Sequence, residues 1–197
     1  MSLSSFEDLR RQTAGGRQIT VAVGAAADRE VLEALAVGAG EGYCRGLLFG
    51  PKGEVEEHLG EIAMPAGSVE IVDVADPAEA AREAVRAVSR GAAEILVKGL
   101  VDTSAILSAV LDRDDGLRTD GVLSHVAIFE IAGFPRLLSV TDAAMNIDPD
   151  LERKGAILRN GVAFLQRLGL SEPKVAVLCA KEKVSDKMPC TIDAAKL

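Results

Sequence analysis

Short apolar segments alternate with amphipathic segments along most of this chain. Residues 19–23 and 46–49 are apolar runs followed by small or turn-forming residues, which predicts two strands. Residues 69–74 and 94–97 predict a third strand and a buried fourth strand. The same pattern predicts three later strands, over residues 123–131, 137–141 and 175–180.

Capping residues predict where the helices begin and end. An N-cap side chain accepts a hydrogen bond from a backbone N–H of the first helical turn, and Asp and Thr are favoured there. Glycine often follows the last helical residue because it adopts a left-handed backbone at little cost. The expected N-caps are Asp28, Asp76, Thr103, Asp148 and Thr191, and the expected stops are Gly38 and Gly169.

Strands separated by helices predict an α/β fold, a three-layer α/β/α arrangement with a mostly parallel sheet. The two strands that flank Gly133 follow one another closely and are expected to form a local antiparallel exception. We assign residues 1–141 to a first α/β domain and residues 142–197 to the start of a second one. Because the chain stops just inside a predicted helix, we expect this second domain to be incomplete.

Composition narrows the class of protein. The 197 residues carry 22 basic and 30 acidic side chains, a net charge of −8, which argues against nucleic acid or an anionic membrane as a partner. No apolar run is long enough for a membrane span, and the N-terminus does not resemble a secretory signal. Cys44, Cys179 and Cys190 form no CxxC pair, so we expect no metal site, no disulfide framework and a cytoplasmic location.

The strongest candidate for chemistry is the turn after the fourth strand, residues 98–103. Lys98 leaves the strand, Gly99 allows close backbone approach, and Thr103 opens a helix. Helix N-termini bind anions through their unpaired N–H groups, so this turn suits a phosphate or acyl phosphate. The alternative is an ordinary turn with a solvated lysine.

Two further strand ends carry suitable groups. Residues 141–146 place a carboxylate and an amide, Asp142 and Asn146, among small side chains that leave room for a ligand; the alternative is a turn that leads to the next helix cap. Residues 181–189 hold three lysines that could meet a nucleotide phosphate, although such mixed-charge runs are commonly solvated loops.

Other candidates are weaker. His125 could shuttle protons, but no Ser/His/Asp spacing supports it, and His58 lies in a charged helix. The glycines of residues 38–42 follow a helix instead of a strand, so they fail the context test for a dinucleotide site. The acidic loop at 112–115 lacks the glycine and glutamate of a calcium loop.

Four segments of the chain resemble the phosphate acetyl/butyryl transferases, most closely the phosphate butyryltransferase branch. They match in order and cover the chain from about residue 90 onward. The segments are VKGLVDT (97–103), LSHVAIFEI (123–131), LLSVTDAAMNIDPDLE (137–152) and PKVAVLCAKEKVSDKMPCTIDA (173–194). The resemblance implies two α/β/α domains with a cleft between them, an architecture like that of isocitrate and isopropylmalate dehydrogenases.

The resemblance also implies a reaction: acyl-CoA and phosphate are converted reversibly into acyl phosphate and CoA, with CoA as a substrate and no cofactor. The expected partners are these small molecules. The residues that we assign to phosphate and the acyl group are Lys98, Thr103, Ser124 and Asn146, and those on the CoA side are Lys183, Ser185 and Lys187. The family's Ser-Arg pair and the aspartate that activates the CoA thiol lie beyond residue 197.

One position departs from the family pattern. Relatives commonly carry an arginine, used for phosphate, in the helix after the KGxxxT turn, and Ser108 stands at that position here. We therefore expect little acyl transfer from this chain. The alternative functions are a non-catalytic relative that binds acyl phosphate or CoA or only dimerises, and a dehydrogenase of the related architecture, for which we find neither a metal cluster nor a nucleotide site.

The seventh predicted strand bears on assembly. Residues 175–180 are apolar, and an exposed edge of this kind invites pairing with another chain. We therefore expect a homodimer or an aggregation-prone species that uses surface after about residue 142. The alternative is a monomer in which a helix over residues 150–168 covers the strand.

Overall fold

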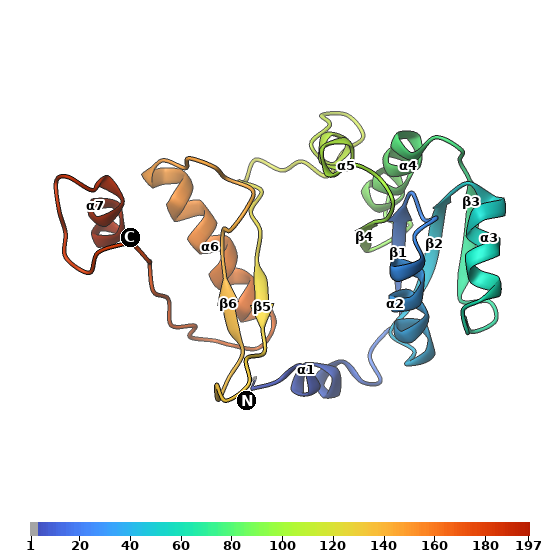
Figure 1. Ribbon diagram of the computed structural model, residues 1–197, viewed down its shortest axis with the longest axis horizontal. Helices are drawn as coiled ribbons and strands as arrows, with labels where there is room; N and C mark the ends of the chain where they lie inside the picture. The colour runs from blue at the N-terminus through green and yellow to red at the C-terminus, as the bar shows by residue number, and fades with distance from the viewer. Residues whose placement is uncertain (1–3) are drawn as a thin grey trace. The chain divides into compact units, whose positions relative to one another are not determined.

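Four parallel strands form the larger sheet of the protein. The computed structural model describes residues 4–197 (Figure 1). The strands are β1 (Ile19–Gly24), β2 (Cys44–Gly50), β3 (Val69–Asp73) and β4 (Ile95–Lys98), in the order β3-β2-β1-β4. All neighbouring pairs are parallel, which confirms the predicted α/β class and its mostly parallel sheet.

Helices cover both faces of this sheet (Figure 1). On one face, α2 (Arg29–Gly40) and α3 (Lys52–Gly60) bury Leu32 and Val55 against Val21, Val23 and Leu48. On the other face, α4 (Pro77–Ser89) packs its alanines on β1, and α5 (Thr103–Val110) packs against α4. Because successive side chains of a strand point to opposite faces, the central strand β1 contributes to both cores.

The short fourth strand lies at the edge of the sheet. It pairs only with β1 among the described residues, and Ile95 is 43% exposed. The prediction that this strand is buried is therefore wrong, because an apolar run cannot by itself distinguish a central strand from an edge strand.

Two of the predicted N-caps in this region are confirmed. Asp28 accepts a hydrogen bond from the Val31 N–H at 3.3 Å, and Asp76 accepts one from the Glu79 N–H at 2.7 Å. Thr103 is the first residue of α5, not its cap; Asp102 holds the cap position without a side-chain hydrogen bond. The α2 helix also runs past Gly38 to Gly40.

The later part of the chain forms a hairpin and two helices. β5 (Ala127–Phe129) and β6 (Leu138–Val140) pair antiparallel, as expected for the strands around Gly133, but both are shorter than predicted. α6 (Leu151–Arg167) and α7 (Pro189–Lys196) follow, and a short helix, α1 (Phe6–Thr13), lies near the start of the chain.

Both predicted caps of these later helices are wrong. Asp150 caps α6 in place of Asp148, by accepting from the Arg153 N–H at 2.8 Å. Met188 is the N-cap of α7, and Thr191 lies inside that helix with its side chain buried. The predicted stop at Gly169 is confirmed in position, since α6 ends just before it and its φ is +96°.

The predicted seventh strand is not formed. No strand pairs with residues 175–180 in the described part of the chain, and Val175, Val177 and Leu178 are 52%, 41% and 87% exposed. A strand needs a neighbour for its N–H and C=O groups, and the apolar pattern cannot supply one.

The chain divides into two compact units, which are described separately. One is Thr13–Thr119; the other comprises Asp120–Leu197 with the N-terminal residues up to Gln12. The division falls between residues 119 and 120, and the domain boundary expected at 141/142 stays a prediction. The likeness to the dehydrogenase architecture and the incompleteness of the second domain stay predictions.

Candidate functional site

The turn at residues 98–103 is docked against the end of β1. The Gly99 N–H donates to the Gly24 carbonyl at 2.9 Å, and the Leu100 N–H donates to the Ala25 carbonyl at 2.8 Å. A Cβ atom on Gly99 would collide with the Ala25 carbonyl, so only glycine fits this approach. The turn therefore lies at the carboxyl end of a parallel strand, the edge at which open α/β sheets bind ligands.

Lys98 is held by this turn. Its Nζ donates to the Gly99 carbonyl at 3.1 Å and to the Val101 carbonyl at 3.0 Å. An ammonium group has three N–H donors, so one remains for a ligand. Thr103 is exposed at the first position of α5, which confirms its predicted place at a helix N-terminus. The lysine is thus bonded to the turn while its side chain stays exposed.

A second polar group of residues, which we call the 124–160 cluster, consists of Ser124, Asp142, Asn146 and Asn160. The Asp142 carboxylate accepts hydrogen bonds from the Ala144 N–H at 3.2 Å, the Met145 N–H at 3.0 Å and Asn146 Nδ2 at 2.5 Å. Asn146 Nδ2 also donates to the Leu123 carbonyl at 3.0 Å. Asn146 therefore ties the segment after β6 to the segment before β5.

These contacts decide the charge of Asp142. Burial raises its pKa, but the hydrogen bonds from Asn146 and from backbone N–H groups outweigh burial and hold the pKa below its usual value. Asp142 stays ionised and is a weak base. Both amide N–H donors of Asn146 are engaged, so it offers a ligand only its amide oxygen.

Ser124 is positioned by Asn160, a residue of α6. Asn160 Nδ2 donates to Ser124 Oγ at 2.9 Å and to the Val122 carbonyl at 2.7 Å. Since Ser124 accepts here, its own hydroxyl hydrogen can be donated to a ligand. The sequence analysis missed Asn160. The signal that could have pointed to it is the glycine that follows it inside the helix, Gly161, which packs close to Thr141.

The three residues assigned to the CoA side share the loop before α7. Lys183 and Lys187 are exposed, and Ser185 is half-buried. The Ser185 N–H donates to Thr191 Oγ1 at 2.9 Å, and Thr191 Oγ1 donates to the Met188 carbonyl at 2.7 Å. Ser185 thus anchors the loop through its backbone, while the two ammonium groups face solvent.

The predicted residues fall into three groups. Lys98 and Thr103 belong to the Thr13–Thr119 unit, and the other five belong to the second unit. Within the second unit, Ser124 and Asn146 share the 124–160 cluster. Of the weaker candidates, His125 has an exposed side chain and its carbonyl accepts from Thr141 Oγ1 at 2.6 Å.

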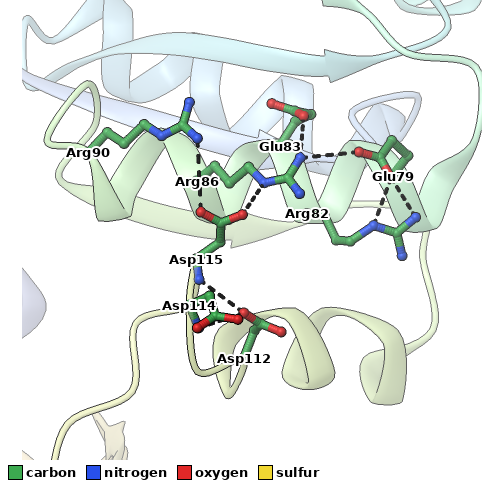
Figure 2. A network of polar contacts seen from close by, with 8 residues as sticks. All are labelled: Glu79, Arg82, Glu83, Arg86, Arg90, Asp112, Asp114 and Asp115. Atoms are coloured by element: carbon green, nitrogen blue, oxygen red, sulfur yellow. Dashed lines mark hydrogen bonds and ion pairs between the residues drawn. The ribbon is translucent and has the colours of Figure 1, made fainter.

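A hollow of about 480 Å³ lies between α4, α5 and the loop at 112–115, and Ser108 lines it. Figure 2 shows the network beside it, in which Arg86 bonds to Glu83 at 2.6 Å and to Asp115 at 2.9 Å. The hydrogen bonds that Arg86 donates to Glu83 and then to Asp115 raise the pKa of Arg86. Asp112 accepts from the N–H groups of two neighbours in its own loop. The guanidinium groups of Arg82 and Arg86 are paired with carboxylates. The network therefore ties α4 to the loop, and neither arginine beside Ser108 is left unpaired to bind phosphate.

Residues 4–197 contain no group of three or more His, Cys, Asp or Glu side chains arranged to hold a metal ion. Within the same residues, every helix is too short or too polar to cross a membrane.

Comparison with known proteins gives consistent matches. A phosphate butyryltransferase of Clostridium beijerinckii is 41% identical over 177 residues, which is 90% of this chain and 59% of that protein. A probable phosphate butyryltransferase of Bacillus subtilis is 44% identical over 192 residues, or 98% of this chain and 64% of that protein. This chain therefore spans less than two thirds of the length of these curated relatives.

A solved structure and a family model agree with these matches. The crystal structure of a branched-chain phosphotransacylase from Enterococcus faecalis superimposes with a TM-score of 0.72 at 29% identity, covering 91% of this chain and 62% of that one. The family model described as phosphate acetyl/butaryl transferase matches residues 78–197, more than half of the chain. The match includes all seven of the predicted site residues, and the chain belongs to the phosphate acetyl/butyryl transferase family.

Proposed function

We propose that the protein is a phosphate acyltransferase of the butyryl type, which converts acyl-CoA and phosphate into acyl phosphate and CoA and back. The observation that carries this proposal is the identity of 41% and 44%, over 90% and 98% of the chain, to proteins named phosphate butyryltransferase and probable phosphate butyryltransferase. CoA is a substrate in this reaction. The whole reaction is a proposal, because this chain matches only 59% and 64% of the length of those relatives.

Phosphate is assigned to the 98–103 turn. The Lys98 ammonium is held by the carbonyls of Gly99 and Val101 in the turn before α5, and its third N–H donor can reach an anion. The N-terminus of α5 adds the partial positive charge of the helix dipole, and the Thr103 hydroxyl is exposed beside it. Together these groups would bind phosphate.

The acyl group is assigned to the 124–160 cluster. Negative charge grows on the carbonyl oxygen as phosphate attacks, and a fixed O–H donor stabilises that charge more than the ground state. Ser124 fits this role because Asn160 fixes its oxygen and leaves its hydrogen available. Asn146 acts by position, since it fixes Asp142 and the Leu123 carbonyl, and not by donating to substrate.

The CoA side is assigned to the loop before α7. The exposed ammonium groups of Lys183 and Lys187 suit the phosphates of CoA, and the Ser185 backbone fixes the loop that carries them. Asp142 is a poor base for the CoA thiol because its pKa is lowered. We assign thiol activation to no residue among the 197.

We further propose a homodimer and a cytoplasmic location. The exposed apolar side chains of Val175, Val177 and Leu178 favour association with a second copy, and light scattering at micromolar concentration tests it. A clean monomer would contradict the dimer. The three free cysteines agree with a reducing compartment.

The test of the reaction is thiol release from butyryl-CoA in the presence of phosphate. Because Ser108 replaces an arginine expected for phosphate, we expect turnover well below the ~10 per second typical of enzymes. Lys98→Ala should raise the phosphate concentration needed for half-maximal rate by about tenfold to a hundredfold, since it removes a charged hydrogen-bond donor. Lys196→Ala, at the exposed end of α7, is the matched control. No phosphate-dependent release from the wild type would contradict the proposal.

Ser108 also favours a second candidate function, a non-catalytic relative that binds acyl phosphate or CoA. The hollow around Ser108 offers only paired guanidinium groups, so nothing in it replaces the expected arginine. Calorimetry with CoA and with acetyl phosphate distinguishes the candidates. Binding without turnover supports the non-catalytic relative, and turnover that rises in Ser108→Arg supports the enzyme.

A further inference from the structure

Two cysteines that the proposed reaction does not use lie in contact. The Cys179 thiol donates to the backbone carbonyl of Cys190 at 3.1 Å. Cys179 lies in the unpaired segment after α6, and Cys190 is the second residue of α7. Cys179 is half-buried and Cys190 is exposed, so the Cys190 thiol is the more accessible of the two.

Neighbouring contacts fix this arrangement. Lys154 of α6 pairs with Asp193 of α7 at 2.6 Å, with both side chains less than a third exposed. Thr191 bonds to Ser185 and Met188 and closes the loop that precedes the helix. The first turn of α7 is thereby held on two sides, which keeps Cys190 beside Cys179.

We propose that Cys179 and Cys190 form a dithiol modification site, which small-molecule disulfides convert reversibly into an intrachain disulfide. The Cys190 thiolate attacks one sulfur of the small disulfide, which breaks its S–S bond and releases the first small thiol. The Cys179 thiolate then attacks the Cys190 sulfur, forms the intrachain bond and releases the second small thiol. The two protein thiols are oxidised, the small disulfide is reduced to two thiols, and the protons go to these.

The order of attack follows from exposure. Burial, and then the neighbouring Cys190 thiol, raise the pKa of Cys179, so its thiol is mostly protonated and slow toward an external disulfide. Once Cys190 carries the mixed disulfide, Cys179 is already beside it and reacts within the chain. Cys44, which is buried in the parallel-sheet unit, is expected to stay reduced.

The disulfide would enclose residues 179–190, a loop that contains Lys183, Ser185 and Lys187. A consequence, which rests on the proposed function, is that oxidation restrains the loop assigned to CoA. The disulfide itself does not depend on that assignment, so its formation and CoA binding can fail independently.

The chain can be tested with oxidised glutathione followed by non-reducing tryptic mapping. Trypsin cuts after Lys174, Lys181, Lys187 and Lys196, so the two cysteines fall in peptides 175–181 and 188–196. We expect these peptides to appear as one linked species that reducing agent separates. The equilibrium constant for the linkage should exceed that of the same chain unfolded in urea by about tenfold or more.

Cys179→Ser is the informative control. It leaves Cys190 exposed but removes the resolving thiol, so a stable glutathione adduct should accumulate on peptide 188–196. The proposal is overturned if the wild type shows the same stable adduct, if the linked species is equally abundant in the unfolded chain, or if no linked species forms. Calorimetry with CoA on the reduced and oxidised chains then tests the proposed loop restraint separately.

Discussion

The two units of the chain differ in how their apolar residues are used. In the Thr13–Thr119 unit, each strand pairs with a neighbour and Leu32, Leu48 and Val55 are fully buried between sheet and helices. In the second unit, the only buried large side chain among the described residues is Ile157, and Leu178 is 87% exposed. The difference therefore lies in whether the apolar side chains of each unit are covered by neighbouring elements.

The two units also differ in how they position their candidate site residues. The parallel-sheet unit fixes the 98–103 turn against β1 through backbone contacts, whereas the second unit positions Ser124 and Asn146 through side-chain amides. Tyr43, the single tyrosine of a chain without tryptophan, lies in the Thr13–Thr119 unit. Its fluorescence therefore follows the unfolding of that unit, while circular dichroism follows both.

The largest expected effect compares two leucines. Leu48→Ala should lower the free energy of unfolding by about 2–5 kcal/mol, because it leaves a cavity in a packed core. Leu178→Ala should change it by less than about 0.5 kcal/mol, as is usual for an exposed position. Urea titration followed by Tyr43 fluorescence and circular dichroism measures both. A large loss in Leu178→Ala would mean that this segment is packed in solution.

A smaller effect compares two glycines. Gly99→Ala should cost about 1–3 kcal/mol, since the new methyl group meets the backbone carbonyl of Ala25, which has little room to move. In Gly161→Ala the methyl group lies 3.1 Å from the Thr141 Cγ2 atom, a side chain that can shift. The gain in helix propensity, about 1 kcal/mol, should offset that contact. Thermal melts measure both variants. Equal losses of stability in Gly99→Ala and Gly161→Ala would contradict the expected difference between the two glycines.

A third prediction compares helix caps in the two units. Asp76→Ala and Asp150→Ala each remove a cap hydrogen bond and should each cost about 1 kcal/mol. If the units unfold independently, only Asp76→Ala should move the Tyr43 transition in urea. A shift of that transition in Asp150→Ala would show that the two units unfold together. Asp102→Ala, at a cap without a side-chain hydrogen bond, is the control.

The smallest effect concerns pH. Hydrogen bonding from Thr20 and then Arg17 lowers the pKa of Glu94, and the pKa of Asp142 is lowered in the second unit. A lowered folded-state pKa contributes stability above the unfolded value, about 4 for these groups, and this contribution is lost as pH falls through the folded value. Both units should therefore weaken below about pH 4.

Substitution assigns this pH dependence to each unit. Glu94→Gln should flatten the acid dependence of the Tyr43 transition, and Asp142→Asn should flatten that of the remaining circular dichroism change. Urea midpoints measured at neutral and acid pH give both. An unchanged acid dependence in either variant would show that other carboxyl groups dominate in that unit.

Local patterns predicted much of the Thr13–Thr119 unit. The β1, β2 and β3 strands and the caps at Asp28 and Asp76 follow from apolar runs and side-chain oxygens within a few residues of the groups they satisfy. The position of the 98–103 turn also followed from its neighbours in sequence. Such features need only local interactions, so the sequence near them was sufficient.

Tertiary structure decided the remaining features. The sequence analysis expected Asp148 as the cap of α6, whereas in the folded chain Asp150 takes that position. Residues 175–180 have the composition of a strand, but a strand exists only where another backbone lies beside it. The sequence determined which segments can form strands and helices and which groups can bind phosphate. The contacts between distant segments decided which strands are paired, and they decided that Asn146 has both N–H donors engaged while Ser124 still has a hydrogen to donate.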